Sequence, residues 1–207
     1  VKPLSPKDRK AFAELPFDED AYKGELGLDA LNGEAGYSTL ERAAARPTLD
    51  VNGIWGGYTG EGAKTVLPSK ANAKISMRLV PDQEPDVIKK LFTDYVHKIA
   101  PETVSITVEA HHGGHPAITD LSFYGLKAAG KAFEKVYGKK PLYSREGGSI
   151  PIVADFKKIL GAESVLMGFG LDSNAIHSPN EHFLMKDFYR GIKTSAAFFK
   201  LLPEYSE

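Results

Sequence analysis

The sequence predicts an α/β protein in two parts: a one-sided sheet with helices, then a sheet that helices cover on both faces. Three patterns indicate this class. Residues 73–81 alternate apolar and polar side chains, as a half-buried strand does. Residues 85–96 repeat apolar side chains at helical spacing. Residues 164–169 contain a continuous apolar run, which is typical of a strand buried on both faces.

Composition excludes several classes of protein. The chain has 207 residues and 42% hydrophobic content, enough to bury the core of one large domain or two small ones. Its net charge of -1 gives no basic field that would attract nucleic acid or an anionic membrane. The absence of cysteine excludes disulfides and thiolate chemistry, which leaves histidine and carboxylates as possible metal ligands.

The ends of the chain and its apolar runs bear on location. No apolar run approaches the length that a bilayer requires. The first residues form neither a signal peptide nor a start at methionine, so we expect the chain to begin inside a longer protein. This composition is compatible with a cytoplasmic protein.

The elements of the first half follow from local patterns. Pro6 favours a short helix through Leu15. The segment from there to about Pro47 has no regular spacing of apolar residues, so we interpret it as an irregular segment on the surface, a surface excursion. Residues 53–62 are rich in glycine but lack the phosphate-loop spacing. They are therefore interpreted as a bulged strand and turn in which Trp55 and Tyr58 pack.

A strand, a helix and a strand complete this half. Residues 73–81 form the first strand, Pro85 begins an amphipathic helix, and residues 104–110 alternate as a second one-sided strand. We therefore expect a sheet with helices on one face. The turn-forming residues 111–116 mark a domain boundary.

The second half of the chain has the pattern of an α/β domain, in which helices alternate with a buried strand. Apolar residues at helical spacing predict helices over 121–137, 150–160 and 186–202, and residues 164–169 predict a buried strand. The expected result is part of a sheet covered on both faces.

His177 is the leading candidate for a metal ligand. It follows the predicted strand 164–169, and ligands of α/β sheets gather at the carboxyl ends of strands. A lone loop histidine is nevertheless more often solvated than a ligand. Glu181 could orient His177 as a neighbouring carboxylate or could begin a solvated segment.

Three further residues, Gly148, Ser149 and Arg78, are candidates for binding an anionic substrate. Gly148 and Ser149 precede a predicted helix, so backbone N–H groups there could hold a carboxylate, although an ordinary capped helix start has the same pattern. Arg78, on the polar face of its strand, could grip a carboxylate or be solvated. Thr65 offers a hydroxyl whose ordinary role is strand propensity.

Two histidines, His112 and His115, flank a Gly-Gly turn. Because no acidic residue lies nearby at a suitable spacing, we favour a hinge with hydrogen-bonding histidines over a metal cluster.

Taken in order, several segments resemble the carnosinase-type dipeptidases, within the dinuclear metallopeptidase superfamily that also includes aminoacylases, glutamate carboxypeptidase and succinyl-diaminopimelate desuccinylase. The resemblance covers the chain from about Thr48 onward. The matching segments are residues 53–54, 60–68, 77–81, 112–114, 145–151 and 177–181.

The resemblance implies two domains. Residues 1–114 would be the later part of an α+β lid (dimerisation) domain of antiparallel sheet plus helices, incomplete at its N-terminus. Residues 115–207 would be the C-terminal part of an α/β phosphorylase/hydrolase-like catalytic domain. A homodimer formed through the lid follows from the same likeness.

The resemblance also implies a site. The full-length enzyme would hold two zinc or manganese ions, and His177 would be at most one of their ligands. Arg78, Gly148 and Ser149 would hold the carboxylate of a small peptide, and Thr65 would reach the substrate from the lid. The general base and the other ligands of such enzymes lie upstream of Val1, so no catalytic residue is expected here.

The function implied is that of a fragment of a dinuclear dipeptidase, which hydrolyses a peptide bond beside a free C-terminal carboxylate through a metal-bridging water. We expect the isolated chain to be inactive without the N-terminal part of the same protein. An N-acyl amino acid deacylase of the same superfamily and a non-catalytic dimerisation or binding module remain alternatives. The sequence predicts neither which side chains the substrate carries nor which metal the enzyme uses.

Overall fold

The computed structural model describes residues 1–146 and 150–206. These residues form two compact units, of which unit 1 contains residues 1–116 with the described part of 144–149. Unit 2 contains residues 117–143 and those from Ile150 onward. This division leaves the assignment of a lid and a catalytic domain as a prediction.

Three short helices begin unit 1: α1 (Pro6–Ala13), α2 (Glu19–Leu26) and α3 (Thr39–Ala45). The helix predicted from Pro6 is confirmed. The predicted surface excursion is wrong in part, because it contains α2 and α3. Both helices are set by their caps rather than by apolar periodicity. In α3 the Ser38 hydroxyl accepts a hydrogen bond from the Glu41 N–H, and the Glu41 carboxylate accepts one from the Ser38 N–H.

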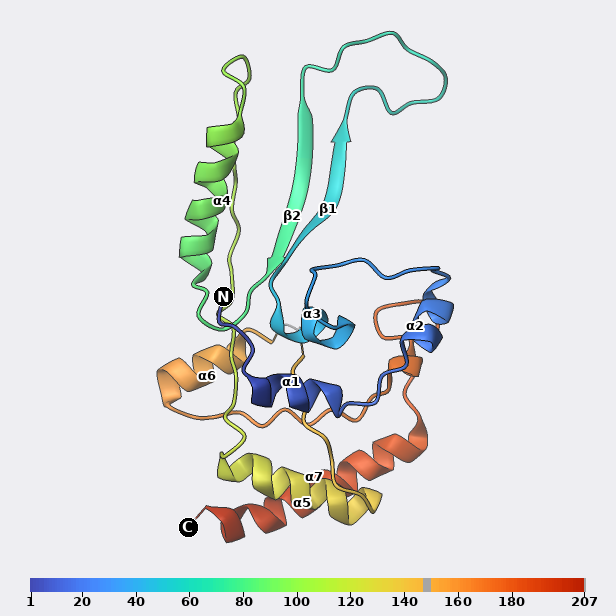
Figure 1. The fold of residues 1–207 in the computed structure, drawn as a ribbon, viewed down its shortest axis with the longest axis vertical. Coiled ribbons are helices and arrows are strands. Elements are labelled where there is room, and N and C mark those ends of the chain that lie inside the picture. Colours follow the sequence, from blue (N-terminus) through green and yellow to red (C-terminus); the bar gives the residue numbers. More distant parts are fainter. Residues whose placement is uncertain (147–149, 207) are drawn as a thin grey trace. The chain divides into compact units, whose positions relative to one another are not determined.

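A long antiparallel hairpin follows, formed by β1 (Thr48–Gly56) and β2 (Ala71–Arg78) (Figure 1). Thr48 pairs with Arg78 at one end, and the register shifts between Val51 and Gly53, where one residue of β1 has no opposite number. The strand predicted at the start of the glycine-rich segment 53–62 is confirmed as the end of β1, but the bulge lies just before this segment, at Asn52. The predicted packing of Trp55 and Tyr58 is wrong, because each side chain is 47% exposed. Most residues of both strands are exposed.

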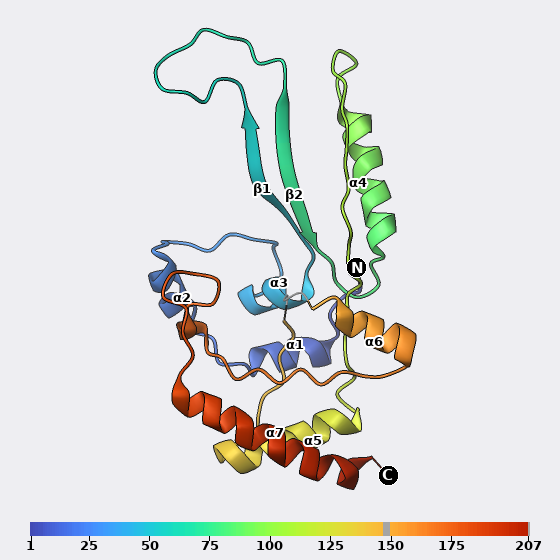
Figure 2. The same ribbon diagram turned by 180° about the vertical axis from the view of Figure 1, so that it is seen from behind.

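Helix α4 (Pro85–Ile99) confirms the predicted amphipathic helix, but no contact joins it to β1 or β2 within the described residues. The strand predicted over residues 104–110 is wrong, because no described residue pairs with it. A strand requires a hydrogen-bonded neighbour. The segment instead runs back beside α4 in both views (Figures 1 and 2), and Gly113 lies against Pro85 at the start of α4.

Unit 2 is built on the pair formed by its two longest helices. Its described elements are α5 (Tyr124–Tyr137), α6 (Ile152–Leu160), the 3-10 turn η1 (Asp172–Asn174) and α7 (Met185–Tyr205). The helices predicted over 121–137, 150–160 and 186–202 are confirmed. Helices α5 and α7 pack side by side (Figures 1 and 2), with the buried small residues Ala128, Ala132, Gly191 and Thr194.

The strand predicted over residues 164–169 is absent from the sheet that the described residues form. The segment packs on the helices instead. Val165 lies against Gly125 of α5, and Phe169 stacks on Phe133 and lies against Gly191 of α7. The predicted burial on both faces is also wrong, because Val165 and Phe169 are only partly buried and Leu166 is 62% exposed.

None of the helices in the described ranges combines the length and the hydropathy that crossing a membrane demands.

Candidate functional site

The loop that carries His177 has an unusual backbone. Its imidazole is exposed, and the residue adopts the left-handed region with φ 60°. Ala175 (φ 54°) and Asn180 (φ 64°) in the same loop also adopt this region. Left-handed backbone is disfavoured for residues with a Cβ, and such strain concentrates at functional sites.

Asn174 holds this loop closed, and the sequence did not single it out. The residue is buried, with 3% of its surface exposed. Its Oδ1 accepts a hydrogen bond of 2.7 Å from the Leu171 N–H, and its backbone carbonyl accepts one of 3.0 Å from the His182 N–H. The Asp-Ser-Asn run that forms η1 was the available signal, because such residues favour local turns.

The described residues do not complete a metal site. Within residues 1–146 and 150–206, no three His, Asp or Glu side chains are grouped to hold an ion. No hydrogen bond joins Glu181 to His177 in these ranges, and the Glu181 N–H donates to Ser178 O at 3.3 Å. The loop therefore offers one exposed imidazole, and no complete set of ligands surrounds it within the described residues.

Arg78 closes β2 opposite Thr48 and is exposed. Among the described residues every other arginine side chain donates a hydrogen bond, whereas Arg78 makes neither a hydrogen bond nor an ion pair. A guanidinium without a protein partner is available to a ligand carboxylate.

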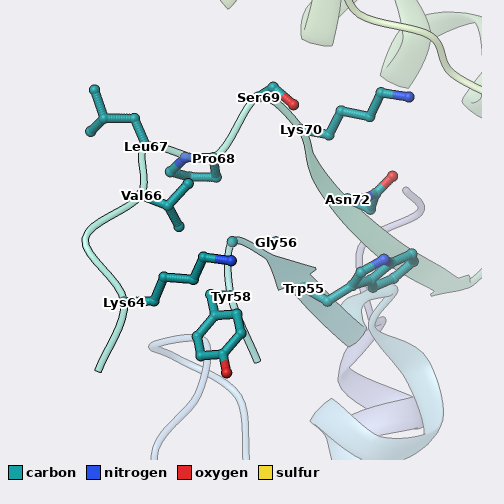
Figure 3. A pocket seen from close by; sticks show the side chains of 11 residues that line it. Trp55, Gly56, Tyr58, Lys64, Val66, Leu67, Pro68, Ser69, Lys70 and Asn72 are labelled. Carbon is teal, nitrogen blue, oxygen red and sulfur yellow. The ribbon is translucent and has the colours of Figure 1, made fainter. Parts of the chain in front are cut away.

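Thr65 lies exposed in the connection between β1 and β2. Its neighbours Lys64 and Val66 line a hollow of about 440 Å³ (Figure 3). The Lys64 ammonium lies 5.1 Å from the centre of the Tyr58 ring, which is cation–π geometry. Thr65 and Arg78 are separated by the length of β2, roughly 23 Å at 3.3 Å per residue. The hairpin therefore does not bring these two predicted residues together.

Gly148 and Ser149 lie outside the described residues, so their predicted role stays a prediction. Helix α6 follows with Pro151 in the N-cap position. Just before the gap, the Arg145 guanidinium donates to Asp8 Oδ1, which links this segment to α1 within unit 1.

The turn that contains His112 and His115 has an acidic neighbour after all. His115 Nδ1 lies 3.2 Å from Glu84 Oε2, at the N-cap of α4. The sequence showed no such partner because Glu84 is distant along the chain. His112 is exposed.

A buried carboxylate in unit 2 also escaped the sequence reasoning. Asp187, in the first turn of α7, is 5% exposed and accepts a hydrogen bond of 3.3 Å from Arg190. The Arg190 guanidinium lies 5.2 Å from the centre of the Tyr137 ring. Burial, with a smaller contribution from the Asp187 charge, raises the pKa of Tyr137. An acidic residue in a first helical turn is ordinary, so nothing in the sequence marked it.

Comparison with known proteins relates these features to a family. Residues 10–201 match the model of the peptidase family M20/M25/M40. The chain belongs to this family. The Cys-Gly metallodipeptidase dug1 of Schizosaccharomyces pombe is 30% identical over 209 residues, which cover 100% of this chain and 44% of the relative. The Beta-Ala-His dipeptidase of Homo sapiens is 28% identical over 96% of this chain and 40% of its own length.

Solved structures agree with this family assignment. The M20 family metallo-carboxypeptidase Sso-CP2 from Sulfolobus solfataricus superimposes with a TM-score of 0.86 at 30% identity, over 98% of this chain and 46% of that one. Human carnosine dipeptidase 1 gives 0.81 at 26% identity, over 99% of this chain and 44% of that one. The likeness to the carnosinase-type dipeptidases and the α/β class are thereby confirmed. The chain spans less than half the length of these M20 relatives.

Proposed function

We propose that the full protein carrying this chain is a metal-dependent dipeptidase, which hydrolyses a peptide bond beside a free C-terminal carboxylate. The observation that carries the proposal is the exposed Arg78 guanidinium, which has no side-chain partner among the described residues. Its position in a chain of the M20 family, whose relatives here include a Cys-Gly and a Beta-Ala-His dipeptidase, supports a carboxylate-binding role.

We further propose that His177 supplies one ligand to a zinc or manganese site, with two ions in the full protein. A divalent metal supplies Lewis-acid polarisation of a carbonyl and activation of water at neutral pH. The described residues contain no complete ligand set, so the other ligands and the general base belong to the remainder of the full protein. The chain by itself is then inactive.

Substitution of Arg78 tests carboxylate recognition. In the full protein, Arg78→Ala is expected to raise KM for an unblocked dipeptide about 10- to 100-fold, because a charge-assisted bidentate interaction is worth roughly 1.5–3 kcal/mol. The same change should alter KM for the corresponding dipeptide amide less than threefold, since the amide lacks the carboxylate. Steady-state kinetics on both substrates measures the difference.

Lys74→Ala is the matched control, because Lys74 is an exposed cation that precedes Arg78 by four residues and lies on the same face of β2. It should leave both KM values unchanged. Equal losses for the acid and the amide with Arg78→Ala would contradict the assignment. Faster turnover of N-acetyl amino acids than of unblocked dipeptides would favour the deacylase alternative.

A further inference from the structure

The loop that carries His177 is closed by one residue. The Asn174 N–H donates to Leu171 O at 2.9 Å, and Asn174 Oδ1 accepts from the Leu171 N–H at 2.7 Å. The Asn174 carbonyl accepts from the His182 N–H at 3.0 Å. Leu171, before the loop, and His182, after it, are therefore both hydrogen-bonded to Asn174. Residues 175–181 form the loop between these bonds.

The backbone of residues 175–181 needs hydrogen bonds of this kind to hold its conformation. Ala175, His177 and Asn180 all hold left-handed conformations, which persist only where surrounding contacts over-determine them. Among the described residues the His177 imidazole makes no hydrogen bond or ion pair, so its own contacts do not fix its direction. The backbone of the loop sets where the ring points.

The Asn174 side chain also has an unfavourable effect on stability. Its Nδ2 is buried and lacks a hydrogen-bond partner among the described residues. A buried N–H group without a partner destabilises the folded state, and an apolar side chain would avoid that cost. The residue is therefore explained by its acceptor oxygen, which an apolar side chain does not offer.

We propose that Asn174 is a positioning residue that holds His177 in its working orientation through the two ties to Leu171 and His182. The assignment of a reaction to His177 rests on the proposed function, whereas the closure of the loop does not. Asn174 touches no reacting atom in this account and acts through the backbone of residues 175–181.

The test combines amide hydrogen exchange with kinetics on the full protein. Asn174→Ala removes the side-chain acceptor and keeps the backbone carbonyl, so exchange of the Leu171 amide is expected to speed at least 10-fold while amides in α5 and α7 keep their protection. With activity divided by folded fraction, kcat for an unblocked dipeptide is expected to fall about 10- to 100-fold, as it does when a residue that orients a ligand is removed, with KM within threefold. Ser173→Ala, an exposed neighbour in η1, is the control and should change neither readout.

Asn174→Asp provides the second variant if the alanine variant does not fold. Aspartate keeps an acceptor for the Leu171 N–H, so exchange at Leu171 should stay within threefold of the wild type. Unchanged exchange in Asn174→Ala, or lost protection in Asn174→Asp, would overturn the closure. Faster exchange with unchanged kcat per folded molecule would overturn the positioning role. A wild-type protein that hydrolyses no dipeptide would refute the proposed function, and the exchange data would still decide the closure.

Discussion

Ala175 carries backbone strain that a single substitution can remove. Its φ and ψ of 54° and 42° are left-handed, which costs a residue with a Cβ about 1–2 kcal/mol. Glycine adopts this region freely but loses more chain entropy on folding, by about 0.4–1 kcal/mol. Ala175→Gly should therefore raise the free energy of unfolding by about 0.5–1 kcal/mol, as measured by denaturant titration.

Ala154→Gly is the control for this prediction, because it makes the same substitution inside α6. There the backbone is helical, so glycine should lower stability by about 1 kcal/mol. Destabilisation by both substitutions would show that the Ala175 conformation carries no relievable strain.

Some residues of the candidate site could be predicted from the sequence, and others could not. Arg78 and His177 could be singled out because strand alternation and position after an apolar run are local properties. The unpartnered state of Arg78 and the burial of Asn174 are not local, since both depend on which other side chains arrive nearby. The roles of Thr65, Arg78, Gly148, Ser149 and His177 stay predictions.

At the scale of elements, α4 leaves an apolar stripe exposed. Val87, Leu91, Tyr95 and Ile99 recur at helical spacing, and each is more than half exposed. We propose that the homodimer expected from the family resemblance buries this stripe against a second copy of the protein, because in a two-fold dimer one self-complementary patch serves both subunits. Leu91→Glu should raise the dimer dissociation constant at least 10-fold in analytical ultracentrifugation.

Lys89→Glu places the same carboxylate on the same helix, away from the stripe, and should leave the dissociation constant unchanged. Equal weakening by both variants would point to net charge, and no weakening by Leu91→Glu would remove α4 from the interface.

Elements were predictable where their signals were local. Helices α4 to α7 follow from apolar periodicity, whereas the bulge of β1 lies at Asn52, before the glycine-rich segment in which it was predicted. Helix α2 lacked that periodicity, although Asp18 and Gly27 cap it at either end. Residues 104–110 alternate and residues 164–169 form an apolar run, yet neither segment pairs as a strand, because neither pattern reports whether a hydrogen-bonding neighbour is present.

At the scale of the whole molecule, an ion pair links distant parts of unit 1. Arg145 and Asp8 stand 137 positions apart. The hydrogen bond from the Ser5 hydroxyl, with further help from the Ser5 N–H and the Arg145 charge, lowers the pKa of Asp8 from its usual 3.8. Because the pKa is lower in the folded state, the stabilisation is complete above pH 3.8 and is lost as the pH falls through the folded value.

Asp8→Asn should therefore be less stable than the wild type at pH 6 by about 1 kcal/mol or less, and the difference should shrink as the pH falls below 3.8. Denaturant titration across this pH range measures the difference. Asp29→Asn, at an exposed residue with no ion pair among the described residues, should show no such pH-dependent gap. A difference in stability that does not shrink as the pH falls below 3.8 would assign the effect to packing.

The bulge in β1 has a consequence for how the length of this chain can change. Val51 and Gly53 face the consecutive residues Ile75 and Lys74, so Asn52 is an extra residue that the ladder already accommodates. Deleting Asn52 would leave every pair on both sides intact. Deleting one residue elsewhere within β1 would move the side chains on one side of the deletion to the opposite face of the hairpin, because side chains alternate with a period of two. A lineage can therefore lose one residue at this place without exchanging the two faces of the hairpin.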